Sequence, residues 1–209
     1  MLAHILYSFV TLFVIIDPVG SAAIFAGLMR GAPRPMRRLY AARGVVTATI
    51  LVLAFAVGGG ALLRAMGITL PAFRIGGGVL LFLLATEMVF ARQSGIRGPT
   101  VPEEEEAEHR RDISVFPLAF PLLAGPGALT SIVLLMERTA SPLEALGVIA
   151  ALITVMGITL ALLLAAPHVM RLIGVTGANV VSRVLGIILA ALAAQLVLDG
   201  IAQGLPALR

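Results

Sequence analysis

An acidic side chain in the middle of an apolar stretch is the feature with the clearest chemical potential. Asp17 lies 12 residues from each end of the apolar stretch 5–29, and Pro18 and Gly20 follow it. An Asp at the centre of a membrane-spanning helix costs about 2.5–3.5 kcal/mol on insertion scales. Pro18 cannot donate a backbone hydrogen bond, and Gly20 loosens the next turn. The pattern therefore predicts a broken or kinked helix at membrane depth.

Two interpretations of Asp17 stay open. In the functional one, Asp17, Pro18, Gly20 and Ser21 bind a substrate or cation, and Asp17 is the counter-ion or proton carrier. Free backbone groups are tolerated inside a membrane only where protein packs on them or where they line a wet cavity. In the structural one, Asp17 is the N-cap of a half-helix that begins at Pro18. The two roles can coexist.

A second candidate break lies within residues 116–127, where three prolines and two glycines fall in twelve residues. Such a segment predicts a discontinuous or re-entrant stretch facing the first break, with Gly125, Pro126 and Gly127 at the site. Two opposed half-helix N-termini would offer N–H donors to an anionic group such as a carboxylate. A kinked packing helix is the alternative interpretation.

Other polar residues supply candidate supporting groups. Arg74 and Arg183 open apolar stretches, so each could extend outward to the interface, bind a backbone break or pair with an acid. Glu87 and Gln195 come late in two stretches, either at the membrane interface or on a solute pathway. Asp199 lies nearer the end of its stretch and is expected in solvent.

The composition places these residues in lipid. Apolar residues make up 59% of the 209 residues and charged residues only 12%, whereas a soluble domain carries roughly a quarter charged residues. The mean hydropathy is +1.05. About 20 apolar residues span a bilayer, and six stretches qualify, which predicts an all-α membrane protein. They are roughly 5–29, 45–63, 75–90, 116–136, 143–166 and 184–201.

Several kinds of chemistry are not expected. The chain has no cysteine, which excludes disulfides, thiolate metal sites and thiol-exchange electron transfer. The three histidines lack metal-ligand spacing, and no phosphate loop or catalytic triad is present, so we expect no metal, no cofactor and no enzyme. The arginines sit mainly at the ends of apolar runs, which does not favour nucleic-acid binding.

The two halves of the chain resemble each other. Three matches occur in order, each copy 107 to 109 residues after the first. They predict a first three-helix repeat over 1–91, a charged cytoplasmic linker over 92–112 and a second repeat over 113–209. Three helices per repeat would invert the second copy in the membrane, an architecture of secondary transporters. The matched segments are 64–69 with 171–176, 74–77 with 183–186, and 17–18 with 125–126.

Arginine placement predicts the orientation. With both termini outside, eleven of the fifteen basic residues face the cytoplasm and four face outward, as the positive-inside rule favours. The four outward arginines are Arg64, Arg74, Arg138 and Arg209.

The chain resembles the MarC family of bacterial inner-membrane proteins, which is similar to the broader LysE-type group. The resemblance covers nearly the whole chain outside the linker, and the segment with three prolines is its most specific part. It departs at Ser21 and Ala23, where many relatives carry Asn and Pro. The residues that carry the resemblance are 17–20, 73–78, 87–88, 112–113, 117–122, 125–127, 182–183, 186 and 199–200.

This resemblance implies six spans in two inverted three-helix repeats, in agreement with the pattern above. Some members of the family are labelled small neutral amino acid transporters. We therefore expect a secondary transporter of a small polar solute, with the lipid bilayer, the solute and a coupling ion as partners. A non-transporting membrane scaffold or regulatory protein is the alternative, and whether copies of the chain associate is left open.

Overall fold

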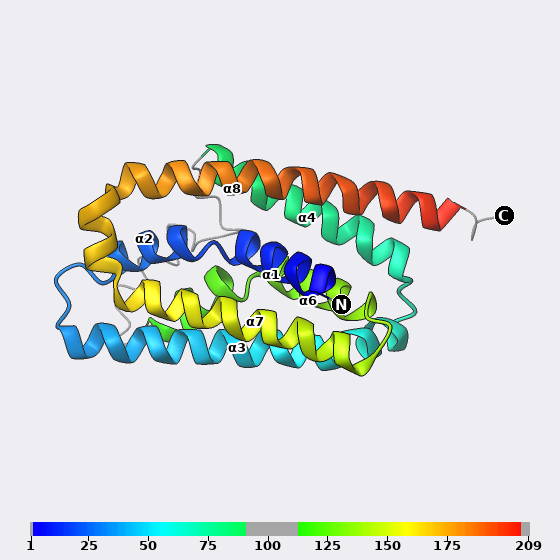
Figure 1. Cartoon of the computed structure of the whole chain (residues 1–209), viewed down its shortest axis with the longest axis horizontal. Helices are drawn as coiled ribbons and strands as arrows, with labels where there is room; N and C mark the ends of the chain where they lie inside the picture. Colours follow the sequence, from blue (N-terminus) through cyan, green and yellow to red (C-terminus); the bar gives the residue numbers. More distant parts are fainter. Residues whose placement is uncertain (1, 91–112, 206–209) are drawn as a thin grey trace.

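A computed structural model of the chain describes residues 2–90 and 113–205, and the predicted linker 92–112 lies outside them. Within the described ranges all regular structure is helical. Figure 1 shows the helices lying roughly side by side along one direction. In chain order they are α1 (Leu2–Ile16), α2 (Pro18–Leu28), α3 (Arg34–Ala65), α4 (Leu70–Phe90), η1 (Ser114–Leu123), α6 (Pro126–Glu137), α7 (Pro142–Leu164) and α8 (Ala166–Gly204).

The helices account for five or six membrane crossings within the described part of the chain. Five segments are long and apolar enough to cross, with α1 and α2 counted together, and η1 with α6 makes a sixth if that pair is one bent span. Successive spans run in opposite directions. The start of α1 and the end of α8 therefore lie at the same end of the bundle (Figure 1). The prediction of an all-helical membrane protein is confirmed.

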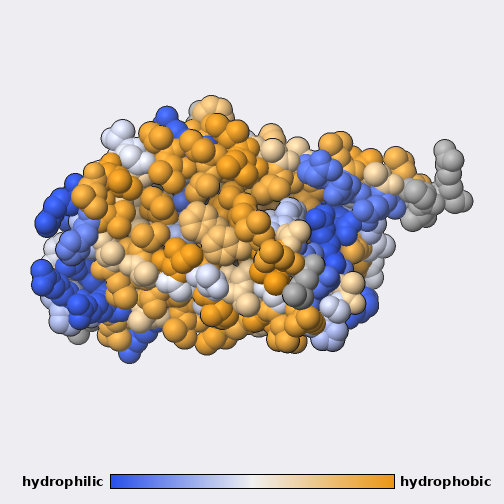
Figure 2. All heavy atoms as spheres, in the orientation of Figure 1, coloured by the Kyte–Doolittle hydropathy of each residue, from blue (hydrophilic) through white to orange (hydrophobic). Residues whose placement is uncertain are grey.

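The outer surface is suited to lipid. Large apolar side chains point outward along the spans, including Val57 at 77% exposed and Ile187 at 61% exposed. On the face in Figure 2, hydrophobic residues cover the middle of the bundle and most hydrophilic residues gather toward its two ends. A soluble protein rarely exposes so large an apolar surface, because water penalises it.

Two helices are longer than the sequence predicts. α3 has 32 residues, which at 1.5 Å per residue is about 48 Å, against a hydrocarbon core of about 30 Å. It starts at Arg34 rather than near residue 45, because its first turns carry arginines outside the apolar region. α8 contains the predicted span 184–201 but begins at Ala166 and changes direction at Gly174, where φ is 66°.

Glycines bring α4 and α8 into close, reciprocal contact. A Cβ added at Gly78 of α4 would lie 2.9 Å from the carbonyl oxygen of Ala193 in α8. A Cβ added at Gly186 of α8 would lie 3.2 Å from the carbonyl oxygen of Ala85 in α4. Each helix therefore uses a glycine to reach the other's backbone, as small residues do in membrane helix pairs.

The remaining helices also pack mainly on helices of the other half of the chain or on the long helices α3 and α7. α1 and α2 pack on α7, while η1 and α6 pack on α3. α2 also contacts α8, and α6 contacts α4. The two interrupted spans thus lie inside the bundle, each against a long helix from the other half of the chain.

We predict that Gly78→Ala separates α4 from α8, because the new methyl group meets backbone atoms that cannot turn aside. Overpacking of this kind lowers the free energy of unfolding by about 1–3 kcal/mol. The matched control is Gly76→Ala two residues away, where an added Cβ has nothing within 4 Å. This control should stabilise the helix by about 0.5–1 kcal/mol. Unfolding in detergent micelles, followed by circular dichroism, measures both; equal stabilities would contradict the contact.

Candidate functional site

Asp17 interrupts the first span at a left-handed backbone position. α1 ends at Ile16 and α2 begins at Pro18, with Asp17 between them at φ 43° and ψ 72°. Asp17 is the one non-glycine residue of the described ranges with positive φ, a conformation that costs most residues energy but that Asp tolerates. Its side chain is fully buried. The predicted break at Asp17 is therefore present, and the acid faces protein.

Side chains satisfy the backbone groups that the break releases. The Gly20 N–H donates to Asp17 Oδ1 at 3.0 Å, so Asp17 is the N-cap of α2. The Ser21 hydroxyl donates to the Ile16 carbonyl oxygen at 2.9 Å. Pro18, at the start of α2, has no N–H to satisfy. Ser21 thus has a defined structural role here.

Ser182 of α8 also bonds the acid. Its hydroxyl donates to Asp17 Oδ2 at 2.6 Å, across 165 residues of sequence. That length is typical of a hydroxyl bonded to a carboxylate. Sequence reasoning assigned no role to Ser182, whose one signal was its place next to Arg183 in a segment shared with relatives. The contact joins the first interrupted span to the last helix of the chain.

The second break has a different construction. η1 contains extended residues at Phe116 and Phe120, just before Pro117 and Pro121, and the axis bends by 55° between η1 and α6. α6 then starts at Pro126 after an extended Gly125, with no side-chain cap. Both predicted breaks exist, but only the first has its N-terminus capped by a side chain.

The two breaks lie at the same level in the bundle. A Cβ added at Gly127 would lie 3.6 Å from Ile15 Cγ2, two residues before Asp17. A cavity of about 10 Å³ lies here, which is at the lower limit for one water molecule. This cavity is therefore too small for a solute such as an amino acid. The cavity is lined by Ile15, Leu84, Pro121, Leu122, Leu123, Gly125, Pro126, Gly127 and Ala128.

Three of the four predicted supporting residues, Arg74, Arg183 and Gln195, lie away from the two breaks. Arg74 is buried and donates to the Gln203 side chain near the end of α8, so it contacts neither a break nor an acid among the described residues. Arg183 is exposed, so these two arginines, matched in sequence, have different surroundings. Glu87 is buried in α4. Gln195 is exposed and donates to Asp199 Oδ1 at 2.7 Å.

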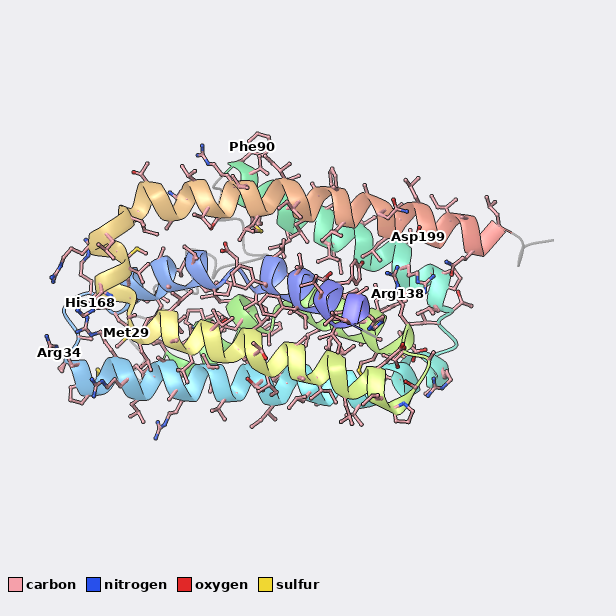
Figure 3. The ribbon with its side chains drawn as sticks, viewed as in Figure 1. Met29, Arg34, Phe90, Arg138, His168 and Asp199 are labelled. Atoms are coloured by element: carbon pink, nitrogen blue, oxygen red, sulfur yellow. The ribbon has the colours of Figure 1, made fainter. Side chains whose placement is uncertain are left out.

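A polar cluster forms at the end of the bundle where α1 begins and α8 ends. Arg138, the C-cap of α6, lies 3.3 Å from Asp199 Oδ2 of α8 and 3.3 Å from the Tyr7 hydroxyl of α1 (Figure 3). Its guanidinium also lies 5.8 Å from the centre of the Tyr7 ring, within cation–π range. The Asp199 side chain is 31% exposed, so it stays partly in solvent while it pairs with Arg138. These contacts join α1, α6 and α8 at one end.

Comparison with known proteins agrees with this architecture. A family model described as MarC family integral membrane protein matches residues 2–205. The chain belongs to the MarC family. A UPF0056 membrane protein of Methanocaldococcus jannaschii is 36% identical over 201 residues, which cover 96% of this chain and 97% of that protein.

Relatives of this MarC family member occur in bacteria and archaea. The UPF0056 inner membrane protein YhgN of Escherichia coli is 32% identical over 198 residues, covering 95% of this chain and 96% of YhgN. A UPF0056 membrane protein of Aquifex aeolicus is 36% identical over 196 residues, which cover 93% of this chain and 90% of that protein. No solved structure matches the chain. The names of these relatives state a membrane location and no solute. Together with the candidate spans, the family shows that the chain is a multi-pass integral membrane protein.

We predict that Ser182→Ala weakens the fold through the buried carboxylate. Loss of one donor to a buried acceptor lowers the free energy of unfolding by about 1–3 kcal/mol. Combined in a double-mutant cycle with Asp17→Ala, which removes both carboxylate oxygens, it should show a coupling energy of about 0.5–3 kcal/mol. The control, Thr154→Val, removes an exposed hydroxyl that donates only to Ala150 of its own helix. Additive effects of the Asp17 and Ser182 changes would contradict the contact.

Proposed function

We propose that this MarC family member is a secondary transporter of a small polar solute, with a neutral amino acid as the first candidate. The observation that carries the proposal is Asp17, a fully buried acid at a backbone break in a membrane span. Asn and Ser cap helices about as well as Asp, and neither carries a charge. An acid there is explained by an additional role, the binding and release of a proton or cation.

The proposal includes two inverted three-helix repeats. Its support is the reciprocal contact of α4 and α8. Gly78 of α4 meets Ala193 of α8, and Gly186 of α8 meets Ala85 of α4. Each residue of one pair lies 108 residues from its counterpart in the other pair, close to the offset of the sequence matches. Transporters built this way bind their solute near the midplane, where discontinuous helices meet.

The site we propose lies between the two breaks. Its first side is formed by the first break, with Asp17, Pro18, Gly20 and Ser21. Its second side is formed by the second break, with Gly125, Pro126 and Gly127. The uncapped N-terminus of α6 offers N–H groups to a solute carboxylate, and Asp17 supplies the coupling proton. The cavity of about 10 Å³ beside the second break is too small for a solute, and we assign the described arrangement to a closed step. Opening requires the two breaks to separate.

A second candidate function is that of a non-transporting membrane scaffold or regulatory partner. Asp17 caps the Gly20 N–H inside a tightly packed break, which is the arrangement that a purely structural acid would adopt. This candidate predicts a permanently dry interior and no flux of any solute. The transport measurement below separates the two.

We further propose that both termini face away from the cytoplasm, on the arginine distribution described above. Expressed in a bacterium, a fusion of alkaline phosphatase to the C-terminus should be active, because the enzyme folds only after export. A fusion placed within residues 92–112 should be inactive, and green fluorescent protein at the same two sites should give the reverse pattern. Active phosphatase in the linker would overturn the orientation.

We predict that Asp17→Asn abolishes proton-coupled transport while the protein still folds and inserts. Asn keeps an oxygen to accept the Gly20 N–H but cannot exchange a proton. The measurement is accumulation of radiolabelled glycine, L-alanine and L-serine in proteoliposomes under an imposed pH gradient, with circular dichroism as the folding control. Glu144→Gln at the exposed start of α7 is the matched acid-to-amide control and should transport normally.

Accumulation by Asp17→Asn at the wild-type rate would overturn the assigned role of the acid. A wild-type protein that moves none of the three amino acids, by accumulation or by exchange, would favour the scaffold candidate.

A further inference from the structure

Buried polar atoms without a hydrogen-bond partner occur mainly on two neighbouring helices, α1 and α6. Within the described ranges five such side-chain atoms occur, and four belong to His4 and Thr11 of α1 and Ser131 of α6. They are His4 Nδ1 and Nε2, Thr11 Oγ1 and Ser131 Oγ; the fifth is Arg74 Nε. A buried polar atom left unsatisfied costs about 1–3 kcal/mol, and folded proteins contain few of them. Thr11 and Ser131 lie where α1 packs on α6, and His4 lies just beyond that contact.

The packing of α1 on α6 places Thr11 and Ser131 at the same level. One end of the contact is the hydrogen bond from Arg138 to Tyr7, and the other is the approach of Gly127 to Ile15. The two helices are therefore antiparallel. Thr11 lies four residues from Tyr7 and four from Ile15, on the ridge that these residues form, because residues four apart share a helix face.

Ser131 occupies the matching place on α6. It lies one turn after Gly127, on the face that meets α1. Its hydroxyl and that of Thr11 are both buried and neither bonds to protein, so a water molecule between the two helices would satisfy both. A hydroxyl can donate one hydrogen bond and accept two, which suits a position in a chain of waters.

The unsatisfied atoms follow one another along α1 and α6 from the end of the bundle toward Asp17. His4 lies two turns before Thr11 on the same face of α1, near the polar cluster of Tyr7 and Arg138. At the other end, the cavity of about 10 Å³ adjoins Ile15, two residues from Asp17. From His4 to Asp17 is thirteen residues, or about 20 Å at 1.5 Å per residue.

We propose that a single file of water runs between α1 and α6 from His4 to Asp17 and carries protons to that carboxylate. Thr11 and Ser131 each accept a proton from one neighbour as they release one to the next, so neither changes its charge. Asp17 gains the proton as a carboxyl group and later returns it. Charged groups of the helices at the outer end include Glu137 and Arg138 of α6, Arg64 of α3, Glu144 of α7 and Asp199 of α8.

The coupling role of this water file, in which protons drive the transported solute, rests on the proposed function. The existence of the file does not. A passage that holds about one water molecule at its inner end passes protons by exchange and excludes the solute. The solute therefore needs a separate opening of the breaks, while the proton route stays narrow.

The chain has no cysteine, so introduced thiols report directly on the presence of water. We predict that Ag⁺, an ion no wider than a water molecule, reacts with the thiols of T11C and S131C and blocks their later labelling by a maleimide after denaturation. Thiolates form only where water reaches the thiol, and they bind soft metal ions. Equal Ag⁺ protection at the control positions would overturn the file.

Two control variants carry thiols in dry surroundings. L12C places one next to Thr11 at a side chain that is fully buried, and V10C places one at a side chain 43% exposed on the outside of the span. Both should remain open to maleimide after Ag⁺ treatment. S131C exchanges one oxygen for sulfur, so it decides the test even if T11C does not insert.

Transport measurements then test the coupling role. T11V and S131A should lose accumulation driven by a pH gradient but keep solute exchange at equal pH, which does not need the proton route. T154V, which removes a hydroxyl bonded within its own helix, should keep both. Loss of both activities in T11V and S131A, or of neither, would overturn the coupling role. A wild type without exchange refutes the proposed function alone, and the Ag⁺ result still decides whether the file exists.

Discussion

The structure depends on one constraint: inside the hydrocarbon no water is available to bond an open backbone group, so protein must supply each partner. Pro18 and the left-handed Asp17 end the regular hydrogen bonding of the first span near its middle. The Asp17 carboxylate and the Ser21 hydroxyl then replace the missing backbone partners. Because Ser182 bonds the same carboxylate, the repair of one helix also holds α8 in place. A local backbone problem thereby becomes a contact between the two halves of the chain.

The second break meets the same constraint differently. Gly125 leaves the start of α6 without a side-chain cap, and a cavity of about one water molecule adjoins it. One break thus holds an acid bonded by protein, while the other leaves N–H groups without a side-chain partner beside space for water. In the function we propose, the acid carries the coupling proton and the uncapped helix N-terminus binds a solute carboxylate. In the water file we propose, the hydroxyls of Thr11 and Ser131, which lack a hydrogen-bond partner, continue the proton route between α1 and α6.

Polar residues that look alike in sequence have different surroundings in the bundle. Arg74 is buried against Gln203, whereas Arg183 is exposed. Asp199, expected in solvent from its place near the end of a stretch, pairs with Arg138 because α6 ends beside it. Position along an apolar stretch indicates depth in the membrane but not the direction in which a side chain points. Direction depends on which helices pack together, and that is a property of the bundle.

The sequence by itself determined the membrane class, the helical fold, the family and the positions of both breaks. These follow from local chemistry, because hydropathy, proline and glycine act within a few residues of where they stand. Only the tertiary structure decided that Ser182 is the partner of Asp17, that Arg138 joins three helices, and that Thr11 faces α6 near Ser131. Such pairings join residues from 61 to 165 positions apart, and each depends on the packing and rotation of helices about their axes. No local pattern encodes those rotations; the close approaches at Gly78, Gly127 and Gly186 set them.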